Sequence, residues 1–296
     1  MIPPDVRSRL KGLRLVSRRA RGGQGFGVHR SHSRGAGLEF AQYRAYEPGD
    51  EPRQIDWKLY ARSDRFFVRE AERESPLALW ILIDASASMS QADAANPAWT
   101  RLQAAKQLAA CLGELALQQG DRFGLIGMCD DSRGLGVLVP EGGSRQRSRL
   151  WIELQALATG KEFPGVEKLA PVWERIATGD LVVVIGDGFD DGCVAMAERL
   201  SAAGREVLFV QVLTTEERDF PFVDGHRFVD PETGEELRGD GAALRAGFLQ
   251  RFDEAQRALQ ARLAHAGIRR VTWWLDQPPD LPLRQLFGDR HAAEQS

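Results

Sequence analysis

The chain has 296 residues and a formal net charge of −3 at pH 7, with 43% hydrophobic and 27% charged residues. This length exceeds the roughly 100–200 residues of a typical domain, so we expect one large domain with an accessory segment. The acidic balance argues against a nucleic-acid partner, and no apolar run is long enough to span a bilayer. Three isolated cysteines without CxxC spacing favour a reducing compartment, so we expect a cytoplasmic protein.

Residues 1–34 carry nine arginines and lysines, with Asp5 as their only acidic residue. We predict a solvated basic arm. A second interpretation is a patch that contacts an acidic partner or an anionic membrane surface, which would place the protein peripherally at the inner membrane. Leu10, Leu13 and Val16 would then line the apolar face of a short helix.

Apolar runs and amphipathic stretches alternate from residue 77 onward. Continuous apolar runs predict buried strands, and apolar positions three and four residues apart predict helices. The expected strands are 77–84, 122–128, 135–139, 180–185, 206–213 and 270–275. The expected helices are 100–119, 144–158, 166–177, 194–203 and 244–265. This alternation predicts a doubly wound, mainly parallel, Rossmann-like α/β sheet covered by helices on both faces.

Two segments do not follow the alternation. Residues 220–238 have turn residues between apolar positions and predict a projecting hairpin. Residues 1–76 show no alternation, so we assign the basic arm and a β-rich accessory segment to this part of the chain. The α/β domain is then expected at residues 77–296.

The first expected strand ends in the sequence "DASAS", which places Asp84, Ser86 and Ser88 where the chain leaves the sheet. Alternate residues of an extended segment point the same way, so this spacing directs three oxygen groups to one point. A carboxylate and two hydroxyls are hard ligands that suit Mg²⁺ or Mn²⁺. Asp187, after a second buried strand, supplies another carboxylate. The other interpretation is helix capping, because Ser and Asp are preferred N-caps.

These residues carry a family resemblance. "LIDASASM" together with "VVIGDGFDD" resembles the metal-ion-dependent adhesion site of von Willebrand factor A domains. The upstream stretch "GLEFAQYRAYEPGDEPRQIDWKLYARSDRFFVRE" is similar to the signature of the bacterial family called domain of unknown function 58. The elements of that signature are a Glu-Phe pair, Arg-x-Tyr-x-Pro-Gly-Asp, Arg-x-Ile-Asp-Trp-Lys and Ala-Arg, at 39–40, 44–50, 53–58 and 61–62.

The resemblance implies a von Willebrand factor A-like domain with a metal whose open coordination position is filled by an acidic side chain of a partner. It implies the following ligands, directly or through water: Asp84, Ser86, Ser88 and Asp187. The expected partner is a MoxR-type AAA+ ATPase, acting with this chain on a client protein. Adhesion sites usually add a threonine, and Thr159 in "ATGKEFPG" is the candidate, although the familiar Thr-x-Leu pattern is missing.

Two functions are compatible with these residues. The first is a non-enzymatic adaptor that binds its partner through the metal during protein assembly or remodelling. The second is a metal-dependent hydrolase or phosphatase in which Asp84 is the nucleophile or a metal ligand. We favour the adaptor mainly because the family resemblance implies it. In addition, Ser86 stands two residues after Asp84, where an aspartyl-phosphate enzyme would need an acid.

Overall fold

The computed structural model describes residues 2–17, 40–47, 50, 52–71, 76–130, 135–229 and 236–288. The chain divides into two units. The smaller unit is Gln24–Pro76, and the larger one combines Met1–Gly23 with Leu77–Ser296.

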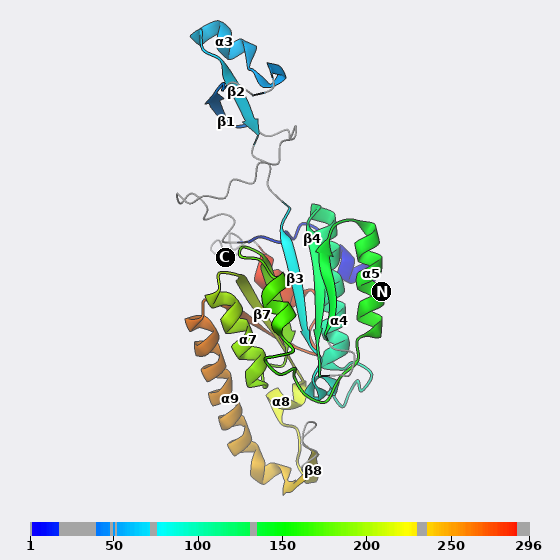
Figure 1. Cartoon of the computed structure of the whole chain (residues 1–296). Helices are drawn as coiled ribbons and strands as arrows, with labels where there is room; N and C mark the ends of the chain where they lie inside the picture. The colour runs from blue at the N-terminus through cyan, green and yellow to red at the C-terminus, as the bar shows by residue number, and fades with distance from the viewer. Residues whose placement is uncertain are drawn as a thin grey trace, which may run out of the picture. The chain divides into compact units, whose positions relative to one another are not determined.

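A six-stranded sheet forms the centre of the larger unit, with the strand order β10-β7-β6-β3-β4-β5 (Figure 1). Its strands are β3 (Ala78–Asp84), β4 (Arg122–Met128), β5 (Gly136–Glu141), β6 (Leu181–Gly186), β7 (Glu206–Leu213) and β10 (Arg269–Trp274). Neighbouring strands are parallel, except that the edge strand β5 is antiparallel to β4. The chain passes from β3 to β4 on one side and later enters β6 on the other, so the order reverses between β3 and β6. The doubly wound, mainly parallel α/β fold is confirmed.

Helices cover both faces of this sheet (Figure 1). Their bounds are α4 (Arg101–Gln119), α5 (Ser144–Ala156), α6 (Ala170–Arg175), α7 (Asp191–Ala202), α9 (Gly241–His265) and α10 (Leu281–Phe287). α4, α5 and α10 share one hydrophobic core with Leu79 and Ile81 of β3. α6, α7 and α9 share the other core with Trp80 and Leu82. Because successive residues of β3 enter opposite cores, the strand must be apolar throughout, which explains its continuous apolar run.

The N-terminal segment differs from the expected solvated arm. Residues 2–17 belong to the larger unit, where Ile2, Val6, Leu10 and Leu15 are buried in the core with α4 and α10. The helix of this segment, α1 (Pro4–Arg9), ends before Leu10, so the three expected apolar positions do not form one helical face. The segment packs against the core and is not solvated because burial of its apolar side chains is favourable; Leu10 is only 1% exposed. The basic residues 18–34 lie outside the described residues, and their contact with a membrane stays a prediction.

Ion pairs neutralise part of the basic charge of this N-terminal segment. The Arg9 guanidinium contacts Asp5 at 2.6 Å and the fully buried Asp280 at 3.0 Å. Asp280 also contacts Arg284 of α10 at 2.9 Å. The hydroxyl of Ser17 donates to the Glu206 carboxylate at 2.6 Å. These contacts attach the first residues of the chain to its last helix and to β7.

The smaller unit contains most of the family signature. Its strands β1 (Phe40–Ala45) and β2 (Phe67–Ala71) pair antiparallel. Between them lie the 3-10 helix η1 (Pro52–Gln54) and α3 (Trp57–Ser63). Asp56 caps α3 by accepting hydrogen bonds from the backbone N–H groups of Lys58 and Leu59 at 3.0 and 3.1 Å. The accessory segment is therefore a two-stranded sheet with a helical insertion.

The expected hairpin corresponds to β8 (Gly225–Val229) and β9 (Glu236–Asp240), which pair antiparallel. A short helix that the sequence analysis did not identify, α8 (Thr215–Asp219), precedes it. Residues 230–235 lie outside the described residues. Of the helices within the described ranges, none is both long and apolar enough to cross a membrane.

Candidate functional site

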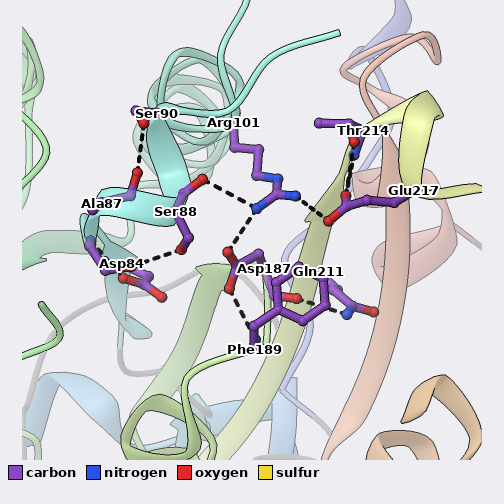
Figure 2. Close-up of polar contacts among 11 residues, drawn as sticks. Asp84, Ala87, Ser88, Ser90, Arg101, Asp187, Phe189, Gln211, Thr214 and Glu217 are labelled. Carbon is purple, nitrogen blue, oxygen red and sulfur yellow. Dashed lines mark hydrogen bonds and ion pairs between the residues drawn. The ribbon is translucent and has the colours of Figure 1, made fainter. Parts of the chain in front are cut away.

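The candidate site lies at the carboxyl ends of β3 and β6, where the strand order reverses (Figure 2). Asp84 is the last residue of β3, and Asp187 directly follows β6. The parallel register pairs Ile83 with Ile185, so the two strands end at the same level of the sheet. The structure thus brings together two carboxylates that are about a hundred residues apart in sequence, at the position where open α/β sheets bind ligands.

Gly186 leaves space for the side chain of Asp84. A Cβ atom added to Gly186 would lie 2.9 Å from the Asp84 Cβ and 3.2 Å from its Oδ2. The first distance is shorter than real Cβ atoms allow, so a residue larger than glycine would collide with Asp84 at this position. The sequence analysis did not identify this residue, although a glycine at a strand end often marks a close approach of another group.

The two serines follow the last residue of β3 along the chain. Ser86 and Ser88 are both buried, and their Oγ atoms are 3.1 Å apart. The backbone N–H of Ser86 donates to Oδ1 of Asp84 at 2.9 Å. Ser86 occupies the N-cap position of the 3-10 helix η2 (Ala87–Ser90), but its side chain makes no capping hydrogen bond. The cap of α4 is instead Thr100, which accepts from the backbone N–H of residue 103 at 3.1 Å. The hydroxyls of Ser86 and Ser88 are therefore not used to cap α4.

Asp84 lacks a partner for one of its carboxylate oxygens. The residue is fully buried, and its Oδ2 makes no hydrogen bond in the structure. Burial first and the nearby charge of Asp187 second raise the pKa of Asp84 to about 7, although hydrogen bonding from Ser86 acts in the opposite direction. Burial also raises the pKa of the Cys193 thiol, with added contributions from Asp84, Asp187 and Asp190. The buried acidic groups of this site therefore oppose one another's ionisation.

A cation of the chain itself already lies in this site. Arg101, at the start of α4, is 3% exposed, and its guanidinium donates to Asp187 Oδ2 at 2.8 Å and to the Ser88 carbonyl at 3.2 Å. It also forms an ion pair with Glu217 (Figure 2). The ring of Phe189, which is half exposed, covers the guanidinium at 5.4 Å from the ring centroid. Asp187 Oδ1 accepts from the Phe189 N–H at 3.0 Å, so both oxygens of Asp187 have partners.

Glu217 connects this site to α8. Its carboxylate accepts from the backbone N–H of Thr214 at 2.8 Å, which is one of the two hydrogen bonds of the capping box of α8. It also accepts from the Thr214 hydroxyl at 3.0 Å. The next backbone N–H, of Thr215, donates to Asp93 at 2.6 Å. The same helix is therefore attached both to Arg101 and to the loop that follows the serines.

Thr159 differs from the other expected ligands. Its loop lies against the site, because the N–H of Gly160 donates to the carbonyl of Ala85 at 2.7 Å. The side chain of Thr159 is nevertheless exposed, whereas the carboxylates and serines are buried. The structure thus groups four of the five expected residues in one buried set, with Thr159 at its margin.

The donor set fits a hard divalent cation. Carboxylate and hydroxyl oxygens are the ligands that Mg²⁺ and Mn²⁺ prefer. The site offers the unbonded Oδ2 of Asp84 and the buried hydroxyls of Ser86 and Ser88. The site contains three carboxylates, of Asp84, Asp187 and Glu217, and one guanidinium. Within the described residues there is no group of three or more His, Cys, Asp and Glu with metal-binding geometry, so the hydroxyls are essential to this assignment.

Arg101 is the main residue that the sequence analysis missed. It occupies the first position of α4, directly after the cap Thr100. A positive side chain is unfavourable there, because the helix dipole places partial positive charge at this end. An arginine at such a position therefore indicates that a carboxylate lies nearby, which is a signal available from the sequence.

Fold and site define a doubly wound α/β domain with a carboxylate and hydroxyl site at the reversal of its strand order. The chain belongs to the family described as "Protein of unknown function DUF58", whose model matches residues 42–259. Two similar proteins are uncharacterized protein Rv1480 of Mycobacterium tuberculosis and uncharacterized protein Mb1516 of Mycobacterium bovis. Each is 27% identical over 238 residues, which cover 78% of this chain and 72% of the relative.

Solved structures with a similar course of the chain include BatB from Bacteroides thetaiotaomicron, at 18% identity and a TM-score of 0.43. That alignment covers 71% of this chain and 95% of the other. The SpRpn10 VWA domain aligns at 15% identity and a TM-score of 0.42, covering 72% of this chain and 95% of the other. At such scores, the fold assignment rests on the strand order described above.

Proposed function

We propose that the protein is a non-enzymatic interaction module that holds Mg²⁺ or Mn²⁺ at the ends of β3 and β6. Asp84, Ser86 and Ser88 would hold the metal, with Asp187 acting directly or through water. An acidic side chain of a partner would then complete the coordination. The observation that carries this proposal is the fully buried Oδ2 of Asp84, which has no hydrogen-bond partner. The segment that follows supplies two buried hydroxyls, of Ser86 and Ser88.

An unpaired buried carboxylate oxygen costs free energy in the folded protein. A divalent cation would remove that cost, since it binds the ionised oxygen and compensates its charge. Phe189 adds an apolar contact at the same place, because it is 50% exposed and lies two residues after Asp187. A partner with an acidic residue next to an apolar one would match both features.

We further propose that this partner is a MoxR-type AAA+ ATPase and that the two proteins act on a client protein. This part of the proposal comes from the family resemblance of the signature and of the strand-end motif. We expect the pair to work in the cytoplasm or peripherally at the inner membrane, the latter through the basic residues 18–34.

The test has two parts. Calorimetric titration of the purified protein with Mg²⁺ measures metal binding directly, and Asp84→Ala should abolish it. Ser90→Ala is the matched control: Ser90 belongs to the same loop, but it is exposed and its hydroxyl donates to the carbonyl of Ala87 at 2.6 Å. Loss of binding in both variants would point to a disturbed loop instead of a lost ligand.

The second part is capture of partners from native lysate with the full chain as bait. EDTA alone is an ambiguous condition, because it also removes Mg²⁺ from the nucleotide of an ATPase. Comparing wild type, Asp84→Ala and Ser90→Ala in Mg²⁺ avoids this problem. Recovery of an AAA+ ATPase by wild type and Ser90→Ala alone supports the metal bridge. Equal recovery by all three proteins contradicts it, and recovery of no ATPase removes the proposed partner.

The alternative function, a metal-dependent phosphatase, is tested with the same proteins. If wild type hydrolyses a generic phosphoester and Asp84→Asn does not, the protein is an enzyme and the proposed adaptor function is wrong.

A further inference from the structure

We infer that Arg101 is a built-in cation of the metal site that competes with the divalent metal for Asp187 and couples metal binding to α8. This inference rests on the proposed function, because it concerns the same site. Its consequence is that metal occupancy sets how the Arg101 guanidinium is shared between Asp187 and Glu217.

The burial of Arg101 supports this role. Surface ion pairs are weak and easily exchanged with water, but the Arg101 side chain is 3% exposed and Asp187 is fully buried. The guanidinium reaches three acceptors: Asp187, Glu217 and the carbonyl of Ser88. The guanidinium is thus held by acceptors on the loop after β6, on α8 and on the segment after β3.

Competition follows from the position of these charges. Both oxygens of Asp187 are engaged, Oδ1 by the Phe189 N–H at 3.0 Å and Oδ2 by Arg101 at 2.8 Å. A metal ligated by Asp187, directly or through water, must share that carboxylate with a positive guanidinium. Two cations at one buried carboxylate repel each other more strongly than in water, so Arg101 lowers the affinity of the site for metal.

Coupling to α8 follows from the second ion pair. A metal at Asp187 weakens the attraction of that carboxylate for Arg101, and Glu217 is the remaining carboxylate in reach (Figure 2). Glu217 is part of the capping box of α8. Stronger pairing of Arg101 with Glu217 should therefore stabilise the first turn of α8 when metal is bound. α8 leads into the β8–β9 hairpin and lies next to α9. Metal binding should therefore also affect the stability of α8 where it contacts these elements.

A purely structural role is the competing explanation. Arg101 would then only attach α4 to the loop after β6 and to α8, and its removal would leave the intrinsic metal affinity unchanged. The two explanations differ in a measurable quantity, the affinity for metal in the absence of any partner.

The experiment measures Mn²⁺ binding to the full chain by electron paramagnetic resonance, with folding checked by circular dichroism. Arg101→Gln should bind Mn²⁺ more tightly than wild type by about 10-fold, within the usual 5- to 150-fold range of coupling between sites. Arg101→Lys keeps the charge and should stay close to wild type. Glu217→Gln retains a capping-box side chain and leaves the guanidinium entirely to Asp187, so it should bind Mn²⁺ more weakly. Arg205→Gln is the control, since Arg205 donates to the Ile176 carbonyl on another part of the domain.

Equal or weaker Mn²⁺ binding by Arg101→Gln, with binding by wild type intact, overturns the competition and leaves the proposed metal site standing. Binding by Arg101→Gln alone supports the inference in its strongest form, in which Arg101 excludes the metal from wild type. Absence of binding in both proteins overturns the inference and the proposed metal site together. If Arg101→Gln does not fold, Glu217→Gln decides, because unchanged affinity in that variant contradicts the competition.

The coupling to α8 is tested separately by hydrogen exchange. Slower exchange of the α8 amides on adding Mn²⁺ to wild type would support the coupling, and unchanged exchange would contradict it.

Discussion

Asp84→Asn should make the metal-free protein more stable at alkaline pH, although it removes a proposed metal ligand. The pKa of Asp84 is raised from 3.8 to about 7, first by burial and second by the charge of Asp187. The folded state therefore holds this proton more tightly than the unfolded chain, and ionised Asp84 opposes folding. This cost is absent below the unfolded-state pKa, grows between about pH 4 and pH 7, and is complete above pH 7.

The difference between a pKa of 3.8 and one of about 7 corresponds to about 4 kcal/mol at full ionisation, as an order of magnitude. The side chain is fully buried, so solvent screening does not reduce this figure. Asparagine keeps an oxygen for the Ser86 N–H but carries no charge. In EDTA at about pH 8, Asp84→Asn should thus raise the free energy of unfolding by up to about 4 kcal/mol, and at about pH 4 by close to nothing.

Urea denaturation in EDTA at both pH values measures this effect. Asp219→Asn is the control, because Asp219 is exposed and hydrogen bonding to Arg218 lowers its pKa, so its substitution should bring no stabilisation. Adding Mg²⁺ should reverse the order at pH 8, since only wild type gains stability from bound metal. Lower stability of Asp84→Asn in EDTA at pH 8 would refute the reasoning, because the buried charge would then be favourable.

Two further substitutions test the packing at the site and the packing of the N-terminal segment in the core. Gly186→Ala places a Cβ 2.9 Å from that of Asp84, so overpacking should cost about 1–3 kcal/mol and weaken Mg²⁺ binding. Gly136→Ala, which meets no atom within 4 Å, should leave stability and metal binding unchanged by the same urea and calorimetric measurements. Leu10→Ala should cost about 2–5 kcal/mol in urea denaturation because Leu10 is core. Lys11→Ala at the exposed neighbouring position should be neutral, and equal effects at both positions would contradict the packing of this segment.

The sheet and its larger helices could be predicted because their sequence patterns are strong. β3 and β6 are continuous apolar runs, as expected for strands that are buried on both faces of a sheet. α4 has a threonine cap at one end and Gly120 in a left-handed conformation at the other, with φ 75°. The α6 region is shorter than the expected helix, since it starts at Ala170. Short helices such as α8 and α10 escaped prediction because one or two turns carry too little periodicity.

The grouping of Asp84, Ser86, Ser88 and Asp187 was predictable from the sequence, but the charges around them were not. Asp84, Ser86 and Ser88 lie within five residues of one another, so the spacing of a single extended segment places them together. Asp187 could be added because parallel strands end at one edge of the sheet. Thr159 is expected only from the resemblance to adhesion sites, which add a threonine from this loop. Its exposed side chain depends on the path of a loop that has no periodic pattern.

The sequence by itself determined the elements and the chemistry of the strand-end motif, since both depend on neighbours along the chain. Only the tertiary structure decided which charges face that motif. Arg101, Asp187 and Glu217 are far apart in sequence. They meet because α4 begins, β6 ends and α8 follows the end of β7 at the same end of the sheet. Burial of the N-terminal segment was likewise decided by packing, since Leu10 and Leu15 enter a core shared with α4, α5 and α10.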